Sequence, residues 1–248
     1  MHRLYPKHES NFNMQLFYNP TIQSTDTVFL FDKEESKHIV KVLRKQEGDI
    51  LFVTNGLGDV FMTKIKLASD SKCTVEILSF EHQPEPKFKL HLAVAPTKMN
   101  ERYEWFLEKA TEIGIHEITP IICEHSERKV IKTDRFQKII ESAMKQSLHY
   151  YMPKLNEAVS FKDFITHEQN GQKFIAHCED TDKNSLKKAL LPNTDCTLLI
   201  GPEGDFSVKE IQLALDNNYI PVSLGSTRLR TETAAIVACH SVVFINEA

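Results

Sequence analysis

The sequence predicts an α/β protein that carries a small, separate β-barrel at its N-terminal end. Before the Gln-Pro-Glu-Pro segment at residues 83–86, short β-like runs alternate with turn signals, and after it β-prone runs alternate with amphipathic helical segments. Two glycine-bearing loops near the C-terminus each follow an apolar β-prone run, which is where open α/β sheets bind ligands. We therefore expect a β-barrel over residues 14–83 and an α/β domain over residues 87–248, with the chemistry at the two loops.

The composition indicates a soluble globular protein. Of its 248 residues, 41% are hydrophobic and 26% are charged, and 30 Lys and Arg against 34 Asp and Glu give a net charge of −4. A slightly acidic protein argues weakly against a polyanionic partner, although a local basic face would override that average. The five cysteines form no C-x-x-C pair and the eleven histidines show no H-E-x-x-H spacing. We therefore expect neither a disulfide framework nor a metal site.

The chain shows no targeting signal. No apolar stretch reaches the length that crosses a bilayer, and the first 13 residues lack the apolar core of a signal peptide. A cytoplasmic protein with no membrane attachment is the simplest expectation. Because Met14 precedes the first strand-like run, residues 1–13 are expected to be a disordered extension, or to lie upstream of a start at Met14.

Four β-like runs predict the barrel, at residues 28–31, 50–54, 60–67 and 74–80. One helical segment at residues 33–45 lies among them. It places four basic side chains largely opposite its apolar ones: Lys37, Lys41, Arg44 and Lys45. This basic face is either an ordinary solvated helix surface or a surface that binds phosphates.

The α/β part predicts strands at residues 88–95, 118–123, 174–177 and 198–200. A helix that opens at Asn100 carries apolar side chains at helical spacing and ends at Gly114. Asp134 is predicted to cap the next helix.

The segment after residue 200 predicts a helix, a strand and a last helix. Ser207 and Glu210 have the spacing of a capping box, in front of an apolar stripe formed by Val208, Ile211 and Leu215. The strand at residues 219–224 contains Pro221, which indicates an edge or an irregular place in the sheet. The last helix, residues 231–246, is apolar around most of its circumference. It is expected either to be threaded into the fold or to pack against a second copy of the chain.

The two glycine-bearing loops together resemble a known signature. I-G-P-E-G-x-F-S at residues 200–207 and L-G-x-x-x-L-R-T-E-T-A at residues 224–234 are similar to the paired motifs of the ribosomal RNA small subunit methyltransferase E family, in the SPOUT class of trefoil-knotted methyltransferases. Shorter matches extend the resemblance over about residues 14–246: V-L-R at 42–44, K-A-T-E-I-G at 109–114, S-E-R at 126–128 and Q-S at 146–147. The chain departs from the family pattern at Asp205, where a glycine is usual.

The resemblance implies a PUA-like β-barrel joined to a knotted α/β domain that forms a homodimer. It also implies S-adenosylmethionine as cofactor and methylation of N3 of a uridine in the decoding region of 16S ribosomal RNA, in free form or within the 30S subunit. Two alternatives stay open. In the first, the chain is a knotted methyltransferase for another RNA, such as transfer RNA. In the second, it is a non-catalytic RNA-binding assembly factor that keeps the fold.

Within this resemblance, site residues are assigned position by position. Arg230 is the candidate for stabilising negative charge on the uracil, and Glu232 and Glu203 are the candidates for accepting its proton. A structural role beside the helix start is the alternative for Glu232. The cofactor candidates share the two loops and their flanks: Ile200, Gly201, Glu203, Gly204, Leu224, Gly225, Leu229 and Arg230. The RNA-binding candidates are the basic residues Lys37, Lys41, Arg44, Lys98, Arg102 and Arg128. The adjacent His177 and Cys178 lack a third group that would orient them, so a structural role is expected for both.

Overall fold

The computed structural model describes residues 14–179 and 182–247. The expectation of a disordered extension over residues 1–13 therefore lies outside the described residues. The described chain falls into two compact units that meet between His82 and Gln83, and each is described by itself. Throughout the described ranges, no helix is long and apolar enough to cross a membrane.

The N-terminal unit is built on one five-stranded sheet in the order β1-β3-β4-β5-β2. Its strands are β1 (Leu16–Tyr18), β2 (Val28–Leu30), β3 (Ile50–Thr54), β4 (Asp59–Leu67) and β5 (Thr74–His82). β1 lies parallel to β3, and the other neighbours are antiparallel. The side chains of Phe17, Phe31, Val53 and Phe61 lie in its buried core.

The predicted helix at residues 33–45 is shorter than expected and changes its winding. α1 (Lys33–Lys37) begins at Asp32, whose carboxylate accepts the Glu35 N–H at 2.8 Å, and it continues as a π-helical turn over His38–Val42. The turn ends before Arg44, whose φ of 56° is left-handed and cannot continue a helix. The buried side chain of Ile39 anchors this segment to the barrel core.

The C-terminal unit contains a larger sheet in the order β11-β13-β10-β12-β6-β7-β8, with β9 paired to β7. Its strands are β6 (Leu90–Val94), β7 (Glu117–Ile122), β8 (Lys154–Leu155), β9 (Val159–Ser160), β10 (Gln172–Ala176), β11 (Asn184–Ser185), β12 (Cys196–Ile200) and β13 (Ile220–Ser223). The pairings are parallel. The loops that leave the carboxyl ends of the central strands therefore meet at one edge.

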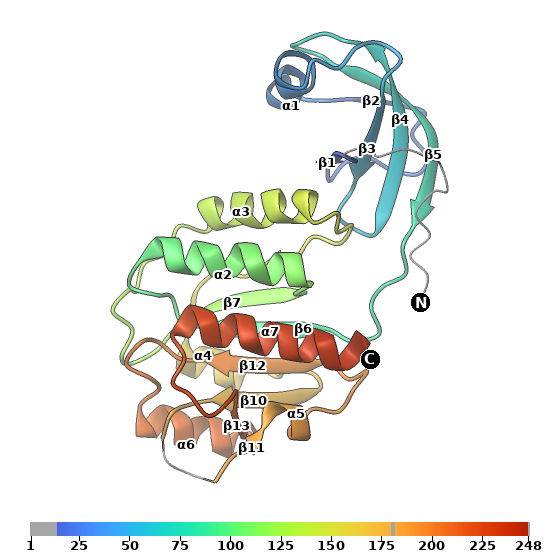
Figure 1. Ribbon diagram of the computed structural model, residues 1–248. Helices are drawn as coiled ribbons and strands as arrows, with labels where there is room; N and C mark the ends of the chain where they lie inside the picture. The colour runs from blue at the N-terminus through green and yellow to red at the C-terminus, as the bar shows by residue number, and fades with distance from the viewer. Residues whose placement is uncertain (1–13, 180–181, 248) are drawn as a thin grey trace. The chain divides into compact units, whose positions relative to one another are not determined.

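Helices cover both faces of this sheet (Figure 1). The helices are α2 (Asn100–Ile113), α3 (Thr133–Gln146), α4 (Phe161–Thr166), α5 (Leu186–Ala189), α6 (Val208–Asp216) and α7 (Thr231–Glu247). α2, α3, α5 and α7 contribute to one hydrophobic cluster, and α4 and α6 contribute to the other. Alternate residues of β6 show the division, because Leu92 packs in the first cluster and Ala93 in the second.

Two helix starts test the capping residues that the sequence predicts. The predicted capping box is confirmed, since the Ser207 hydroxyl accepts the Glu210 N–H and the Glu210 carboxylate accepts the Ser207 N–H. The prediction that Asp134 caps its helix is wrong: α3 begins one residue earlier, and Asp134 lies inside its first turn. An aspartate there still faces the positive end of the helix dipole, which explains the misleading signal.

The apolar stripe predicted for α6 needs correction, and α7 is only partly covered by the described chain. In α6 only Ile211 of the predicted stripe is buried, whereas Val208 is 70% exposed and Leu215 is 38% exposed. α7 buries Ala235, Ala238, Cys239 and Val242 against the sheet and α2, but Phe244 on its outer side is 63% exposed. The described chain therefore leaves the outer side of α7 uncovered, and packing of this side against a second copy stays a prediction.

Pro221 lies close to the sheet edge, as its residue type indicates. β13 is the second strand from that edge, and the outer strand β11 pairs only with Val222 and Ser223. The missing N–H of Pro221 therefore faces no β11 residue.

Candidate functional site

The two glycine-bearing loops lie side by side at the carboxyl edge of the sheet. The first leaves β12 after Ile200, and the second leaves β13 and leads into α7. The Thr231 hydroxyl, at the start of α7, donates to the Gly201 carbonyl at 3.0 Å and is buried. The loops are thus joined directly, although they are 30 residues apart in the chain.

A cavity of about 720 Å³ opens beside these loops. Its wall is formed by residues 176–179 after β10, Lys183, Asp205 of the first loop, residues 222–229 and Ala234 of α7. Leu224, Gly225 and Leu229 of the predicted cofactor residues are in this wall. The remaining cofactor candidates lie outside it: Ile200, Gly201, Glu203, Gly204 and Arg230.

Asp205 is held rigidly in the cavity wall. Its φ of 63° is left-handed, a conformation that glycine adopts freely and that aspartate tolerates better than most residues. One carboxylate oxygen accepts the Cys178 N–H at 2.7 Å and the other accepts the Phe206 N–H at 2.9 Å. The carbonyls of Gly204 and Asp205 both accept Nδ1–H of His125 at 3.1 Å. Asp205 therefore stands in a backbone conformation that also suits glycine, and its carboxylate bridges the loop to the segment after β10.

The charges around the cavity are distributed unevenly. The Lys183 ammonium donates to the backbone carbonyls of His177 and Glu179. Burial first, and then the nearby Lys183, lower the pKa of His177, which favours the neutral imidazole at neutral pH. Arg228 is exposed and also lines the cavity. Within the described ranges Asp205 forms no ion pair with any of these cations.

Two buried carboxylate oxygens lie near the same loops. Oε1 of Glu203 accepts the Lys98 N–H at 2.9 Å, and Oε1 of Glu232 lies 3.9 Å from Nε of Arg102. Oε2 of Glu203 and Oε2 of Glu232 are buried, and no described residue hydrogen-bonds to either. A buried carboxylate oxygen without a donor is costly, so these two atoms mark a place where a ligand can supply one.

Arg230, the predicted cation of the site, forms no ion pair with these two carboxylates. Its side chain is exposed and forms no hydrogen bond or ion pair with the described residues. The cation next to Glu232 is Arg102, from the first turn of α2.

Three predicted RNA-binding residues lie in or beside the loops after β6 and β7: Lys98, Arg102 and Arg128. The Lys98 ammonium pairs with Glu127 at 2.8 Å, and this contact raises the pKa of Lys98. The Arg128 guanidinium donates to the Asn100 side chain, and at 2.9 Å to the Lys98 carbonyl. Arg128 therefore ties the two loops together inside the protein. The three candidates of the N-terminal unit are all exposed: Lys37, Lys41 and Arg44. Lys41 forms an ion pair with Asp70 at 3.5 Å.

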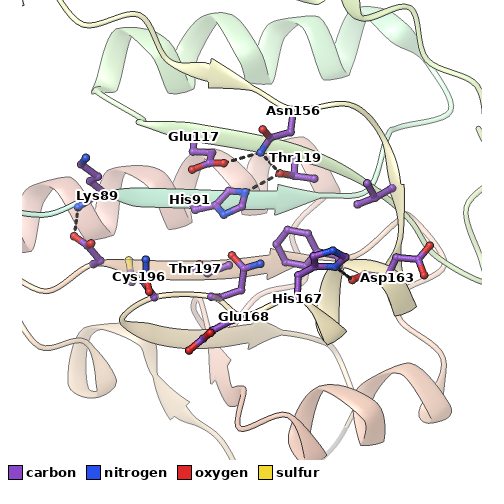
Figure 2. Close-up of a pocket in the computed structure, with 15 residues that line it drawn as sticks. Lys89, His91, Glu117, Thr119, Asn156, Asp163, His167, Glu168, Cys196 and Thr197 are labelled. Carbon is purple, nitrogen blue, oxygen red and sulfur yellow. Dashed lines mark hydrogen bonds between the residues drawn. The ribbon is translucent and has the colours of Figure 1, made fainter. Parts of the chain in front are cut away.

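A second cavity, of about 440 Å³, lies at the opposite edge of the sheet, beside the first residues of β6, β7 and β12 (Figure 2). His91 Nε2 lies 2.7 Å from the Thr119 hydroxyl, and the Asn156 amide donates to Thr119 and to Glu117 at 2.7 Å each. Burial lowers the pKa of His91, so its imidazole is neutral at neutral pH. These polar groups satisfy one another and form a structural network.

Sequence reasoning missed several residues of the first cavity. Lys183 has no motif around it, Arg228 occupies an unspecified position of the second signature motif, and His177 and Cys178 were expected to be only structural. The rule that ligands bind at carboxyl ends of strands is the signal that could have identified His177 and Cys178, because they directly follow β10. As for metals, no group of three or more His, Cys, Asp or Glu that could hold an ion occurs in residues 14–179 and 182–247.

Comparisons with known proteins agree with this architecture. Residues 83–243 match the family described as RNA methyltransferase domain, and residues 31–78 match the RNA methyltransferase PUA domain. The chain is 33% identical to a ribosomal RNA small subunit methyltransferase E of Buchnera aphidicola, with 85% of each chain covered. It is 28% identical to the protein of that name from Rickettsia conorii, covering 92% of this chain and 94% of the relative.

Solved structures give the same result. A probable rRNA-methyltransferase from Porphyromonas gingivalis is 38% identical and superposes with a TM-score of 0.86 over 94% of this chain and 98% of the other. A putative methyltransferase from Legionella pneumophila, solved in complex with S-adenosylmethionine, is 30% identical with a TM-score of 0.84 over 94% and 97%. The predicted fold class, a SPOUT-type knotted α/β domain with a PUA-like N-terminal barrel, is confirmed. The chain belongs to the ribosomal RNA small subunit methyltransferase E family.

Proposed function

We propose that this protein transfers a methyl group from S-adenosylmethionine to N3 of a uridine in the decoding region of 16S ribosomal RNA. Family membership supports methylation of small-subunit ribosomal RNA, the activity in the names of its relatives. The observation that carries the proposal is the direct contact between the two signature loops, through Thr231 and Gly201, beside a cavity of about 720 Å³. We also propose that the protein works in the cytoplasm, where this RNA is found.

The residues present fit the cofactor. The cavity lies within the range of roughly 300–1,000 Å³ that is usual for small-molecule sites. Gly225 leaves backbone open to the cavity, since a Cβ built on it would meet no atom within 4 Å. The wall offers cations in Lys183 and Arg228 for a carboxylate, and an anion in Asp205 for a positive group. We infer that the wall, together with the flanking candidates of the two loops, holds the cofactor.

S-adenosylmethionine supplies a methyl group that its sulfonium makes electrophilic, and the electron pair of the broken carbon–sulfur bond stays on sulfur. The residues of this chain must handle the acceptor. Uridine N3 must lose its proton, and Oε2 of Glu203 or of Glu232 is buried and free to accept it. Arg230, exposed on the second loop, is proposed to move onto the uracil oxygens and stabilise their negative charge.

The basic residues are proposed to bind the RNA backbone. Lys37, Lys41 and Arg44 are exposed on the N-terminal unit, and Lys98 and Arg102 lie beside the loops. Arg128 would act by holding the loops after β6 and β7 in place, because its guanidinium is engaged within the protein. We also propose a homodimer in which the exposed outer side of α7, around Phe244 and the stacked His240, packs on a second copy.

Transfer of labelled methyl groups tests the function. The protein is incubated with labelled S-adenosylmethionine and with 30S subunits, free 16S ribosomal RNA or transfer RNA, and the modified nucleotide is mapped by mass spectrometry. We expect label at N3 of one uridine of the small-subunit RNA. Label only in transfer RNA would favour the first alternative, and cofactor binding without transfer to any RNA would contradict the proposal. No cofactor binding at all, with normal binding to 30S subunits, would favour an assembly factor.

A further inference from the structure

Asp205 stands in the first loop where the family pattern usually has glycine, and it forms part of the cavity wall. A glycine there would remove one carboxylate from a wall that also contains Glu179, Lys183 and Arg228. We propose that Asp205 makes the cavity select the positively charged methyl donor over its neutral demethylated product, S-adenosylhomocysteine. This inference rests on the proposed use of S-adenosylmethionine.

The carboxylate is fixed in place. Its two oxygens accept the N–H groups of Cys178 and Phe206 at 2.7 and 2.9 Å, so it links the loop after β12 to the segment after β10. The backbone beneath it is held by His125, whose Nδ1–H donates to two carbonyls of the loop. Two hydrogen bonds thus hold the carboxylate and two more hold the backbone around it, which keeps the charge in the wall when a ligand enters.

The negative charge also lacks a direct partner. Among the described residues no cation lies within ion-pair distance of Asp205. The ammonium of Lys183, in the same wall, is occupied by the carbonyls of His177 and Glu179. His177 is buried, and a neutral imidazole contributes no charge. Arg228 also lies in this wall, but among the described residues it is not within ion-pair distance of Asp205, so the carboxylate can attract a cationic ligand that enters the cavity.

The donor and the product differ by one positive charge, which interacts electrostatically with the Asp205 carboxylate. S-adenosylmethionine carries a sulfonium in addition to its ammonium and carboxylate, whereas S-adenosylhomocysteine carries a neutral thioether in its place. Their other atoms are shared. A fixed anion in the cavity wall therefore stabilises the donor more than the product, which helps the product leave after each transfer.

Calorimetric titration of the full-length protein with each of the two ligands tests the inference. The measured quantity is the ratio of the Kd for S-adenosylhomocysteine to the Kd for S-adenosylmethionine. In Asp205→Asn this ratio should fall roughly fivefold, because a unit charge is removed from a partly screened site. Asparagine tolerates the left-handed backbone and keeps one acceptor, and any general loosening of the loop affects both ligands and cancels in the ratio.

Asp205→Gly, which restores the family residue, should lower the ratio by a similar factor and provides a second variant with no backbone strain. Asp216→Asn removes an exposed carboxylate of α6 outside the cavity wall and should leave the ratio as in the wild type. An unchanged ratio in both Asp205 variants, with both ligands still bound, overturns the inference and leaves the proposed function intact. Failure of the wild type to bind S-adenosylmethionine overturns the proposed function, and this inference with it.

Discussion

The hydroxyl of Thr231 donates to the carbonyl of Gly201 at 3.0 Å and joins the two signature loops inside the protein. Thr231→Val has nearly the same shape but cannot donate this bond. We expect it to lower the free energy of unfolding by about 1–3 kcal/mol, since a buried carbonyl loses its donor, and to weaken cofactor binding. Urea denaturation and calorimetry measure the two effects. Thr231→Ser keeps the hydroxyl and should retain most of both, so equal losses in the two variants would contradict this role.

Glu232 is buried, and one of its carboxylate oxygens has no donor among the described residues. If it accepts the uridine proton, Glu232→Gln should reduce kcat roughly 100-fold or more while the Kd for S-adenosylmethionine changes little. Glu203→Gln is the matched variant at the second candidate. Because a general base works only when deprotonated, whichever variant removes the acidic limb of the pH–rate profile identifies the proton acceptor. Full activity in both would exclude these carboxylates from that step.

The lowered pKa of His116 leads us to expect a loss of stability in mild acid. Its Nδ1 accepts the Leu90 N–H at 3.2 Å, and burial lowers its pKa from 6.5 to about 4. The unfolded chain binds this proton more tightly than the folded protein does. The contribution of neutral His116 to the free energy of unfolding is therefore fully present above pH 6.5. It is lost as the pH falls toward 4, which lowers the free energy of unfolding by roughly 3 kcal/mol. Urea unfolding of the wild type and of His116→Asn across this range isolates the contribution. Parallel pH curves for the two proteins would contradict it.

Gly171 is needed for close backbone approach. Its φ is +73°, and a Cβ built on it would lie 1.9 Å from the carbonyl oxygen of Asp195, at the start of the β10–β12 pairing. Gly171→Ala should cost more than about 3 kcal/mol of unfolding free energy, since both the backbone and the neighbour must move. Gly48→Ala, at φ +94° with open space around it, should cost only about 1–2 kcal/mol of left-handed strain. Similar unfolding midpoints for the two variants would contradict the steric argument.

Glu210 has two structural contacts. Besides the capping box with Ser207, its second oxygen accepts the Glu124 N–H at 2.8 Å from the loop after β7. Ser207→Ala should therefore cost about 1 kcal/mol of unfolding free energy, and Glu210→Ala should cost more, because it also releases the other loop. Thermal or urea unfolding compares the two. A smaller effect in Glu210→Ala than in Ser207→Ala would show that the contact with Glu124 contributes nothing.

Local patterns in the sequence predicted the longer helices and strands and the place of the two loops, but not the short elements β8, β9, α4, β11 and α5. The capping box at Ser207 is an interaction over three residues, so its partners are visible in the sequence itself. Where packing competes with local preference, the patterns misled. Val208 is exposed because the short helix α6 turns only one side, around Ile211 and Ala214, to the sheet.

The sequence by itself determined the family, the α/β class and the position of the signature loops, because motifs and periodicity are properties of neighbouring residues. Only the tertiary structure decided which side chains share the cavity. Asp205 meets Cys178 across 27 residues, and His125 meets Gly204 across 79. Such pairs are created by the crossing of the chain between parallel strands, and no local spacing records them. The same crossing places Asp205, the departure within the motif, among the charged residues of the cavity wall.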